Sequence, residues 1–161
     1  MADQPMFNKR IVWKNPDGSL AITCPVADSR CREESETAWL ERVASLVKPH
    51  PLAIRLEDRS PDELPESRRF RNAWREAGGK PRVDMVLARE QRMGEIRQKR
   101  NNLLRESDGL LAVAREMDAS RKVEGLLAIR QGLRDIPQKT NLEHLTTPEA
   151  LENFEPDWPS G

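Results

Sequence analysis

The stretch DMVLAREQRMGEIRQKRNNLLRES, residues 84–107, decides the fold, because the hydrophobic period changes there from that of strands to that of helices. Asp84 can cap the start of a helix. The apolar residues that follow recur at near-heptad spacing: Val86, Met93, Ile96 and Leu103. Arg89 and Arg100 interrupt this stripe. We therefore expect a helical arm to begin here, with an apolar face poorly suited to a sealed core of its own.

The arm is expected to continue as far as Pro137. Asp108-Gly109 should break the first helix, and a second helical pattern then runs on to Ile136, with an additional break at residues 118–120 left open. Pro137 lacks a backbone N–H and disfavours helical angles at Ile136, so the second helix should end there. Two such helices would form an antiparallel hairpin, or one would pair with a partner in a coiled coil.

Strand patterns fill the region before the arm. RIVWKNPDGSLAITCP, residues 10–25, alternates around a turn at 15–18 and predicts a β-hairpin. LAIRL, residues 52–56, predicts a strand. RRFRNAWREAGGKPRVDM, residues 68–85, predicts a second hairpin with its turn at Gly78-Gly79, with Phe70, Asn72 and Trp74 facing the core and the arginines facing away.

One helix should lie between these strands. Ser35 is a suitable N-cap, and the apolar stripe expected behind it consists of Ala38, Trp39, Val43, Leu46 and Val47. After the arm, the last residues are loop-like except for a short helix with Thr147 as cap and Pro148 at its first position. The expected fold class is α+β: a small head with β-hairpins (1–83), a helical arm (84–137) and an irregular, extended acidic tail (138–161).

Composition sets limits on function. Lys and Arg number 27 and Asp and Glu also number 27, so no global field draws the chain to nucleic acid or to a membrane. No apolar run approaches the ~18 residues of a membrane span, and the first residues lack the apolar core of a signal peptide. We expect the chain to act in a reducing cytoplasm, with no membrane partner.

No pattern typical of catalysis or cofactor binding is present in the sequence. There is no glycine-rich phosphate loop. Cys24, Cys31, His50 and His144 match no common zinc spacing, and Cys24 is expected on a buried strand face. We therefore expect no enzyme, metal centre or cofactor. RRFRNAWR, residues 68–75, combines arginines with aromatics, so a nucleic-acid adaptor using the Arg68–Arg82 strand is the alternative function.

Two further motifs carry a resemblance. RQKRNNLLRESD (97–108), then RQGLRDIPQKT (130–140) and a terminal Trp-Pro, resemble a pattern found in tail-assembly proteins of bacteriophages and prophages. RIVWKNPDG and the segment from FRNAW to VDMVLARE are also similar to small phage tail proteins. The resemblance implies a non-enzymatic tail protein: a chaperone of tail-fibre assembly in the bacterial host cytoplasm, or a subunit retained in the virion tail.

The resemblance also implies which residues contact the tail or tail-fibre partner. Arg100 and Leu103-Leu104 should meet Leu133 and Asp135 across the hairpin, and self-association through the arm is an option. Arg89 and Arg100 should pair with Glu149, Glu152 and Asp157 of the tail, or with another chain. Trp158 is expected to anchor in a partner or to pack back on the head. The expected partner-binding set is Arg89, Arg100, Leu103, Leu104, Leu133, Arg134, Asp135 and Trp158.

Overall fold

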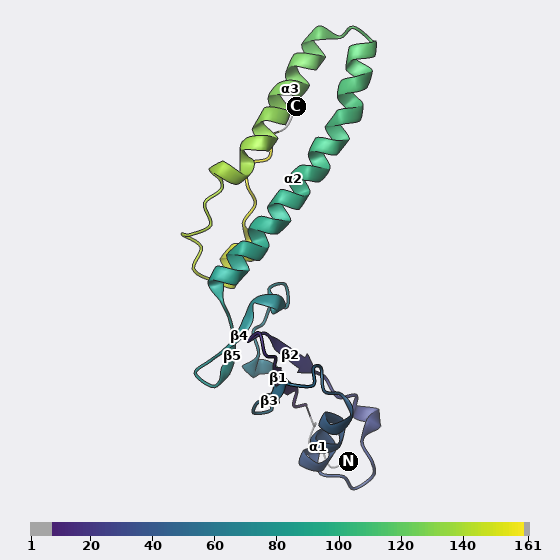
Figure 1. Ribbon diagram of the computed structural model, residues 1–161, viewed down its shortest axis with the longest axis vertical. Helices are drawn as coiled ribbons and strands as arrows, with labels where there is room; N and C mark the ends of the chain where they lie inside the picture. The colour runs from purple at the N-terminus through teal and green to yellow at the C-terminus, as the bar shows by residue number, and fades with distance from the viewer. Residues whose placement is uncertain (1–7, 160–161) are drawn as a thin grey trace, which may run out of the picture. The chain divides into compact units, whose positions relative to one another are not determined.

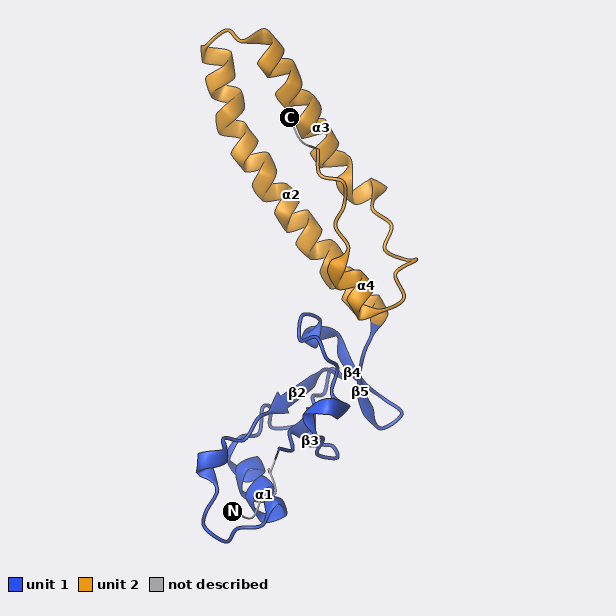
Figure 2. Cartoon of the chain, turned by 180° about the vertical axis from the view of Figure 1, so that it is seen from behind, with its two compact units in different colours: residues 1–84 blue, residues 85–161 orange. Residues whose placement is uncertain are grey.

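The computed structural model describes residues 8–159, and the chain divides into two compact units, residues 1–84 and 85–161 (Figures 1 and 2). The first contains short antiparallel strands and one α-helix, and the second is helical. The fold is therefore α+β, as the sequence predicts. Among the described helices, none combines the length and apolar character that crossing a membrane requires.

Unit 1 is built on a three-stranded antiparallel sheet with the order β2-β1-β3. β1 (Ile11–Lys14) pairs with β2 (Leu20–Thr23), which confirms the first predicted hairpin, and Gly18 adopts a φ of +80° in its turn. β3 (Ile54–Arg55) pairs with the other edge of β1 and is shorter than the predicted strand. Leu52 is exposed, so it adds no core contact that would favour a longer strand beginning at residue 52.

α1 (Glu36–Leu46) covers this sheet, and the Ser35 hydroxyl accepts a hydrogen bond from Ala38 N as predicted for the N-cap. The core that results consists of Ile11, Trp13, Trp39, Leu40, Ala44 and Ala53. Part of the predicted stripe is wrong, because Ala38, Leu46 and Val47 are exposed. The helix ends at Leu46, where its last turn has passed beyond the sheet face that buries Trp39.

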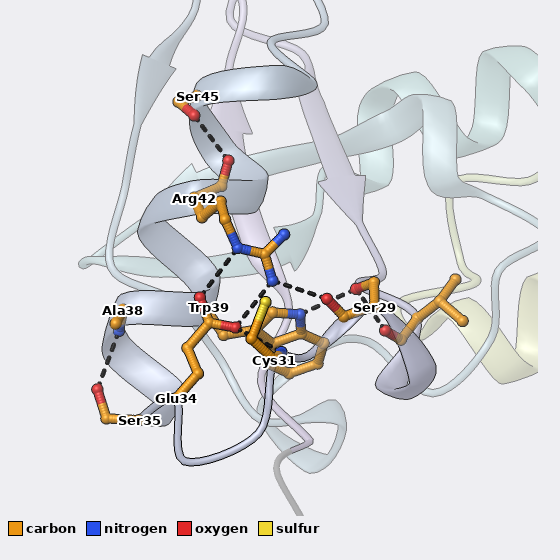
Figure 3. A network of polar contacts seen from close by, with 9 residues as sticks. Ser29, Cys31, Glu34, Ser35, Ala38, Trp39, Arg42 and Ser45 are labelled. Carbon is orange, nitrogen blue, oxygen red and sulfur yellow. Dashed lines mark hydrogen bonds and ion pairs between the residues drawn. The ribbon is translucent and has the colours of Figure 1, made fainter.

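A polar network fastens the loop before α1 to the helix (Figure 3). Arg42 Nε and Nη2 donate to the two oxygens of Glu34 at 2.9 and 2.8 Å, and Nη2 also donates to the carbonyl of Ser29. Trp39 Nε1 donates to Ser29 Oγ at 3.0 Å. The hydrogen bonds from Arg42 and from the Cys31 backbone lower the pKa of Glu34 to about 2. The loop with η1 (Ala27–Ser29) is thereby held across α1.

The second hairpin is present but begins later than predicted. β4 (Trp74–Ala77) pairs with β5 (Lys80–Val83), and Gly78 and Gly79 both have positive φ, as a tight two-residue turn requires. Before it, the chain forms η3 (Arg71–Ala73), so Arg68–Arg82 is not one continuous strand. Phe70 and Trp74 are buried as expected, but Asn72 is exposed. A 3₁₀ turn can bury Phe70 and Trp74 as a strand would. The burial of these two residues therefore could not distinguish the two structures, and the predicted strand began too early.

Two loops complete unit 1 around Arg59, which is nearly buried. Its guanidinium donates to Glu63, to Glu57 and to the carbonyl of Gly79 at 3.0, 2.6 and 2.7 Å. Glu63 belongs to η2 (Pro61–Glu63). Arg59 thus ties a Pro-rich loop to the turn of the β4–β5 hairpin.

Unit 2 is an antiparallel pair of helices, α2 (Met85–Glu116) and α3 (Ser120–Lys139), packed side by side (Figures 1 and 2). The predicted break at Asp108-Gly109 is wrong, because α2 runs through it. The single turn lies instead at 117–119, overlapping the additional break that the sequence left open at 118–120, and Asp118 adopts a φ of +52° there. Asp tolerates that conformation better than most residues, whereas a glycine inside a helix costs only about 1 kcal/mol.

The predicted end of the second helix at Ile136 is also wrong. α3 continues through Pro137 to Lys139, and Thr140 N donates to the carbonyl of Ile136 at 2.9 Å. A proline this close to the end removes one backbone hydrogen bond, and the residues after it still donate to carbonyls one turn back. Ile136 is buried, so packing holds the last turn in place.

α2 has 32 residues and α3 has 20, so roughly three turns of α2 have no α3 beside them. The C-terminal segment covers this part. α4 (Pro148–Asn153) packs on α2, with the Thr147 hydroxyl accepting from Ala150 N as its predicted cap. Leu142 and Leu151 are buried. Residues 140–159, which we call the strap, are therefore part of the packed unit and not an extended tail.

Candidate partner-binding site

The strap is fastened to α2 by a group of four side chains that we call the Glu155 clasp: Arg92, Lys99, Glu155 and Trp158. Arg92, only 5% exposed, donates from Nη2 to the carbonyl of Phe154 and to Glu155 Oε1, the latter at 3.1 Å. Lys99 Nζ lies 3.1 Å from Glu155 Oε2, and Trp158 Nε1 donates to the same oxygen at 2.9 Å. Lys99 Nζ is also 4.7 Å from the Trp158 ring centroid.

The clasp keeps Glu155 ionised. The hydrogen bond from Trp158, with those from Lys99 and Arg92, lowers the pKa of Glu155 to about 2. An acid with so low a pKa carries no proton near neutral pH, so it cannot serve as a general acid there. Its chemical role is to join two basic side chains of α2 to the indole that follows it.

The end of the strap reaches α3 at Gly132. A Cβ added there would lie 3.1 Å from Cβ and 3.2 Å from Cγ of Pro159. Gly132 belongs to the RQGLRDIPQKT motif and Pro159 to the terminal Trp-Pro, so the two sequence motifs meet in the fold. Trp158 and Pro159 are thereby held between the two helices that the strap joins.

Arg130 fastens α3 to α2 near the predicted break. Its Nη1 donates to the carbonyl of Leu104, to Ser107 Oγ and to Asp108 Oδ1 at 3.0, 2.6 and 2.6 Å. Ser107 is buried, and its hydroxyl donates to the same Leu104 carbonyl. These contacts bring the first motif, LLRESD, against the second, which begins at Arg130.

The arginines expected to bind tail carboxylates have other partners within the chain. Arg89 donates to the carbonyl of Leu145 at 3.2 and 3.0 Å, and its nearest carboxylate is Glu143 at 4.0 Å. Arg100 binds the neighbouring Asn101. The expected pairing of either arginine with Glu149, Glu152 or Asp157 is therefore wrong within the chain. Pairing with another chain stays a prediction.

The other predicted site residues divide between the inside and the outside of the hairpin. Leu133 is buried between the helices, and Leu103 and Leu104 are half-buried. Arg134 is exposed, and Asp135 pairs with Lys139 of its own helix at 3.3 Å. Trp158 lies in the Glu155 clasp and is half-buried. Of the predicted set only Arg134 is exposed, and Arg89, Arg100 and Asp135 are half-buried like Trp158.

Sequence reasoning missed Arg92, Lys99, Glu155 and Arg130. Arg92, Ile96 and Lys99 are spaced at i, i+4 and i+7, which places them on one face of a helix. The sequence could therefore have predicted that basic side chains lie beside the apolar stripe. Which acid would meet that edge was not readable, because the contact depends on where the strap returns. For Arg130, no feature of the sequence other than its position in the RQGLRDIPQKT motif indicated a contact with α2.

A row of apolar side chains on α2 is left uncovered near the helix turn. Leu110, Val113 and Met117, spaced as one helix face, are 54, 50 and 72% exposed. Leu111 and Ala114 of the same helix are buried. We call the three exposed residues the α2 stripe. These residues belong to α2, because that helix runs on past Asp108-Gly109 to Glu116.

Cysteine and histidine side chains do not gather in the part of the chain that the structure describes. Within residues 8–159, no three His, Cys, Asp or Glu side chains are arranged to hold a metal ion. Cys24 is exposed and lies just after β2, so the expectation of a buried strand position is wrong. Comparison with protein-family models, with curated proteins and with solved structures finds no match for this chain.

Proposed function

We propose that this chain is a non-enzymatic protein of bacteriophage tail assembly, acting on tail or tail-fibre proteins through protein–protein contacts. The α2 stripe is the observation that carries the proposal. Three large apolar side chains on one helix face, each half exposed or more, are typical of a surface that another protein covers. The resemblance of the two arm motifs and the terminal Trp-Pro to phage tail-assembly proteins supplies the class of partner.

The meeting of those motifs in unit 2 supports the same function. Arg130 of the second motif joins α3 to α2, and Gly132 of the same motif contacts Pro159 of the strap, so the motif residues help to form the scaffold that presents the stripe. A hairpin fixed along its length can bind a partner without reorganising, which lowers the entropic cost of binding.

The test is genetic and structural. The gene should lie among tail genes of a phage or prophage, and its deletion should leave the host producing particles without complete tails or tail fibres, as counted by negative-stain electron microscopy. Expression of the wild-type chain from a plasmid should restore them. Mass spectrometry of purified particles then separates a chaperone, which is absent, from a tail subunit, which is present.

A pair of variants focuses the test on the stripe. Val113→Asp places a charge on the stripe, and Ala112→Asp places the same charge on an exposed neighbour outside it. Restoration should fail with Val113→Asp and succeed with Ala112→Asp, with circular dichroism showing both variants folded. Normal particles after deletion of the gene, or a gene outside any phage region, would overturn the proposal.

A further inference from the structure

β2 is an edge strand. It pairs with β1 on one side, and no other strand in the described part of unit 1 is hydrogen-bonded to its second side, although β4 packs close to it. In an antiparallel ladder, every second residue of an edge strand directs its N–H and C=O away from the paired strand. Beyond the turn contact of Ser19 with Asn15, residues 8–159 provide no further backbone partner for this strand. β2 can therefore accept one more strand.

A cavity of about 580 Å³ lies along β2. Leu20, Ala21 and Ile22 form one side of it, and the segment from Arg68 to Arg75, with Trp74, forms the other. Its size falls within the ~300–1,000 Å³ of ordinary ligand pockets. A short length of extended chain would fit beside the four residues of β2.

The cavity is basic. Arg68, Arg71 and Arg75 line it, against Asp17 as the lining carboxylate. Arg75 is engaged with the carbonyls of Asn72 and Trp74. Arg68 and Arg71 have no ion pair with any side chain among residues 8–159, and both are exposed. Two guanidinium groups are thus free to bind carboxylates, which they do best as paired donors.

Hydrogen bonding is also incomplete here. Trp74 Nε1 is a buried donor and Asn15 Oδ1 a buried acceptor, and neither has a partner. Both residues line the cavity. Leaving such an atom unpaired costs about 1–3 kcal/mol. Both atoms are closed to solvent, so a peptide would pair with them only through a shift of the cavity wall.

We infer that unit 1 binds an acidic, extended peptide segment of another protein, which adds to β2 as a fourth strand and places its carboxylates on Arg68 and Arg71. Backbone hydrogen bonds to β2 supply the alignment, and the arginines select acidic side chains. This site is distinct from the α2 stripe and does not rest on the proposed function. Nucleic acid fits less well, because Trp74 is only 4% exposed and offers no ring face for stacking.

The experiment uses the full chain labelled with ¹⁵N and titrated with a capped peptide of alternating Glu and Thr. Amide signals of Leu20–Thr23 should shift progressively, with a dissociation constant below about 1 mM. A matched peptide with Gln in place of Glu should bind about fivefold more weakly or worse. A Glu-Thr peptide N-methylated at alternate residues should not bind, because it cannot pair as a strand.

Two double variants test whether the peptide contacts Arg68 and Arg71. Arg68→Gln with Arg71→Gln should weaken the Glu-Thr peptide about fivefold. Arg32→Gln with Lys48→Gln removes the same charge from exposed residues of unit 1 outside the cavity and should leave binding unchanged. Equal binding of the Glu and Gln peptides, full binding of the N-methylated peptide, or no shift in β2 would each overturn the proposal. Stronger shifts of the same amides by an oligothymidylate would overturn it in favour of single-stranded nucleic acid.

Discussion

Pro159 packs directly on Gly132, so the last described residue of the strap lies against the middle of α3. Any side chain at position 132 would enter space that the proline occupies, with the added Cβ 3.1 Å from Cβ of Pro159. The glycine of RQGLRDIPQKT is therefore explained by packing. It lets the terminal Trp-Pro reach the helix, although glycine weakens the helix itself.

Gly132→Ala should show whether helix propensity or packing against Pro159 has the larger effect at this position. Alanine gains about 1 kcal/mol of helix propensity, but the contact with Pro159 must open to admit it. We expect no net gain, or a loss of about 1 kcal/mol, in the free energy of unfolding measured by urea titration of the helical circular dichroism signal.

Gly125→Ala is the matched control for this change. Gly125 lies in the same helix, and a Cβ added there meets nothing within 4 Å. It should stabilise unit 2 by up to about 1 kcal/mol. Equal stabilisation by both substitutions would show that Pro159 does not rest on Gly132 in solution.

Gly109→Ala should stabilise unit 2, also by about 1 kcal/mol, because α2 is continuous through this position and a Cβ there has open space. Gly78→Ala should instead lose about 1 kcal/mol, because Gly78 has a φ of +61° in the β4–β5 turn. Thermal unfolding followed at 222 nm measures both. A loss with Gly109→Ala would argue for a helix break at Asp108-Gly109.

The Glu155 clasp should weaken in acid. The pKa of Glu155 is about 2 in the folded chain against an ordinary value of 4.5, so the unfolded chain binds the proton more readily. Its contribution to stability is complete above about pH 4.5 and is lost as the pH falls toward 2. The indole N–H signal of Trp158 should stay constant from pH 7 to 5 and shift below that range.

Two variants test which groups lower this pKa. Trp158→Phe removes the hydrogen bond that contributes most, so the pKa of Glu155 should rise toward its ordinary value in a ¹³C carboxyl titration. Glu155→Gln should leave the Trp158 indole signal without the acid shift. A Trp158 signal that shifts unchanged in Glu155→Gln would assign the titration to another group.

Local chemistry made part of this fold predictable. The turns at Asn15–Gly18 and Gly78-Gly79 and the caps Ser35 and Thr147 each depend on a few adjacent residues, and all four are confirmed. The errors occurred where tertiary contacts outweighed a local preference of about 1 kcal/mol. Gly109 lies within a helix that is buried at Leu111 and held by Arg130.

The candidate site was less predictable for a related reason. Its motifs could be located, and Trp158 could be marked as unusual, but the acid that meets Arg92 and Lys99 depends on the path of the strap. That path follows from the difference in length between α2 and α3, which in turn depends on where the helices end. Arg89 and Arg100 were paired with tail carboxylates because they interrupt the apolar stripe, and the sequence pattern could not show that a carbonyl of the strap would meet Arg89.

The strap should prove part of the hydrophobic core of unit 2, and Leu151→Ala tests this. Leu151 is fully buried in α4, so its truncation should cost about 2–5 kcal/mol in the free energy of unfolding. Glu149→Ala, two residues earlier and exposed, should change it by less than about 0.5 kcal/mol. Removal of residues 141–161 should destabilise the helices at least as much as Leu151→Ala does, because Leu142 is lost with Leu151, while the amide signals of unit 1 stay in place. A truncated chain with unchanged helical stability would mean that the strap does not contribute to the core of unit 2.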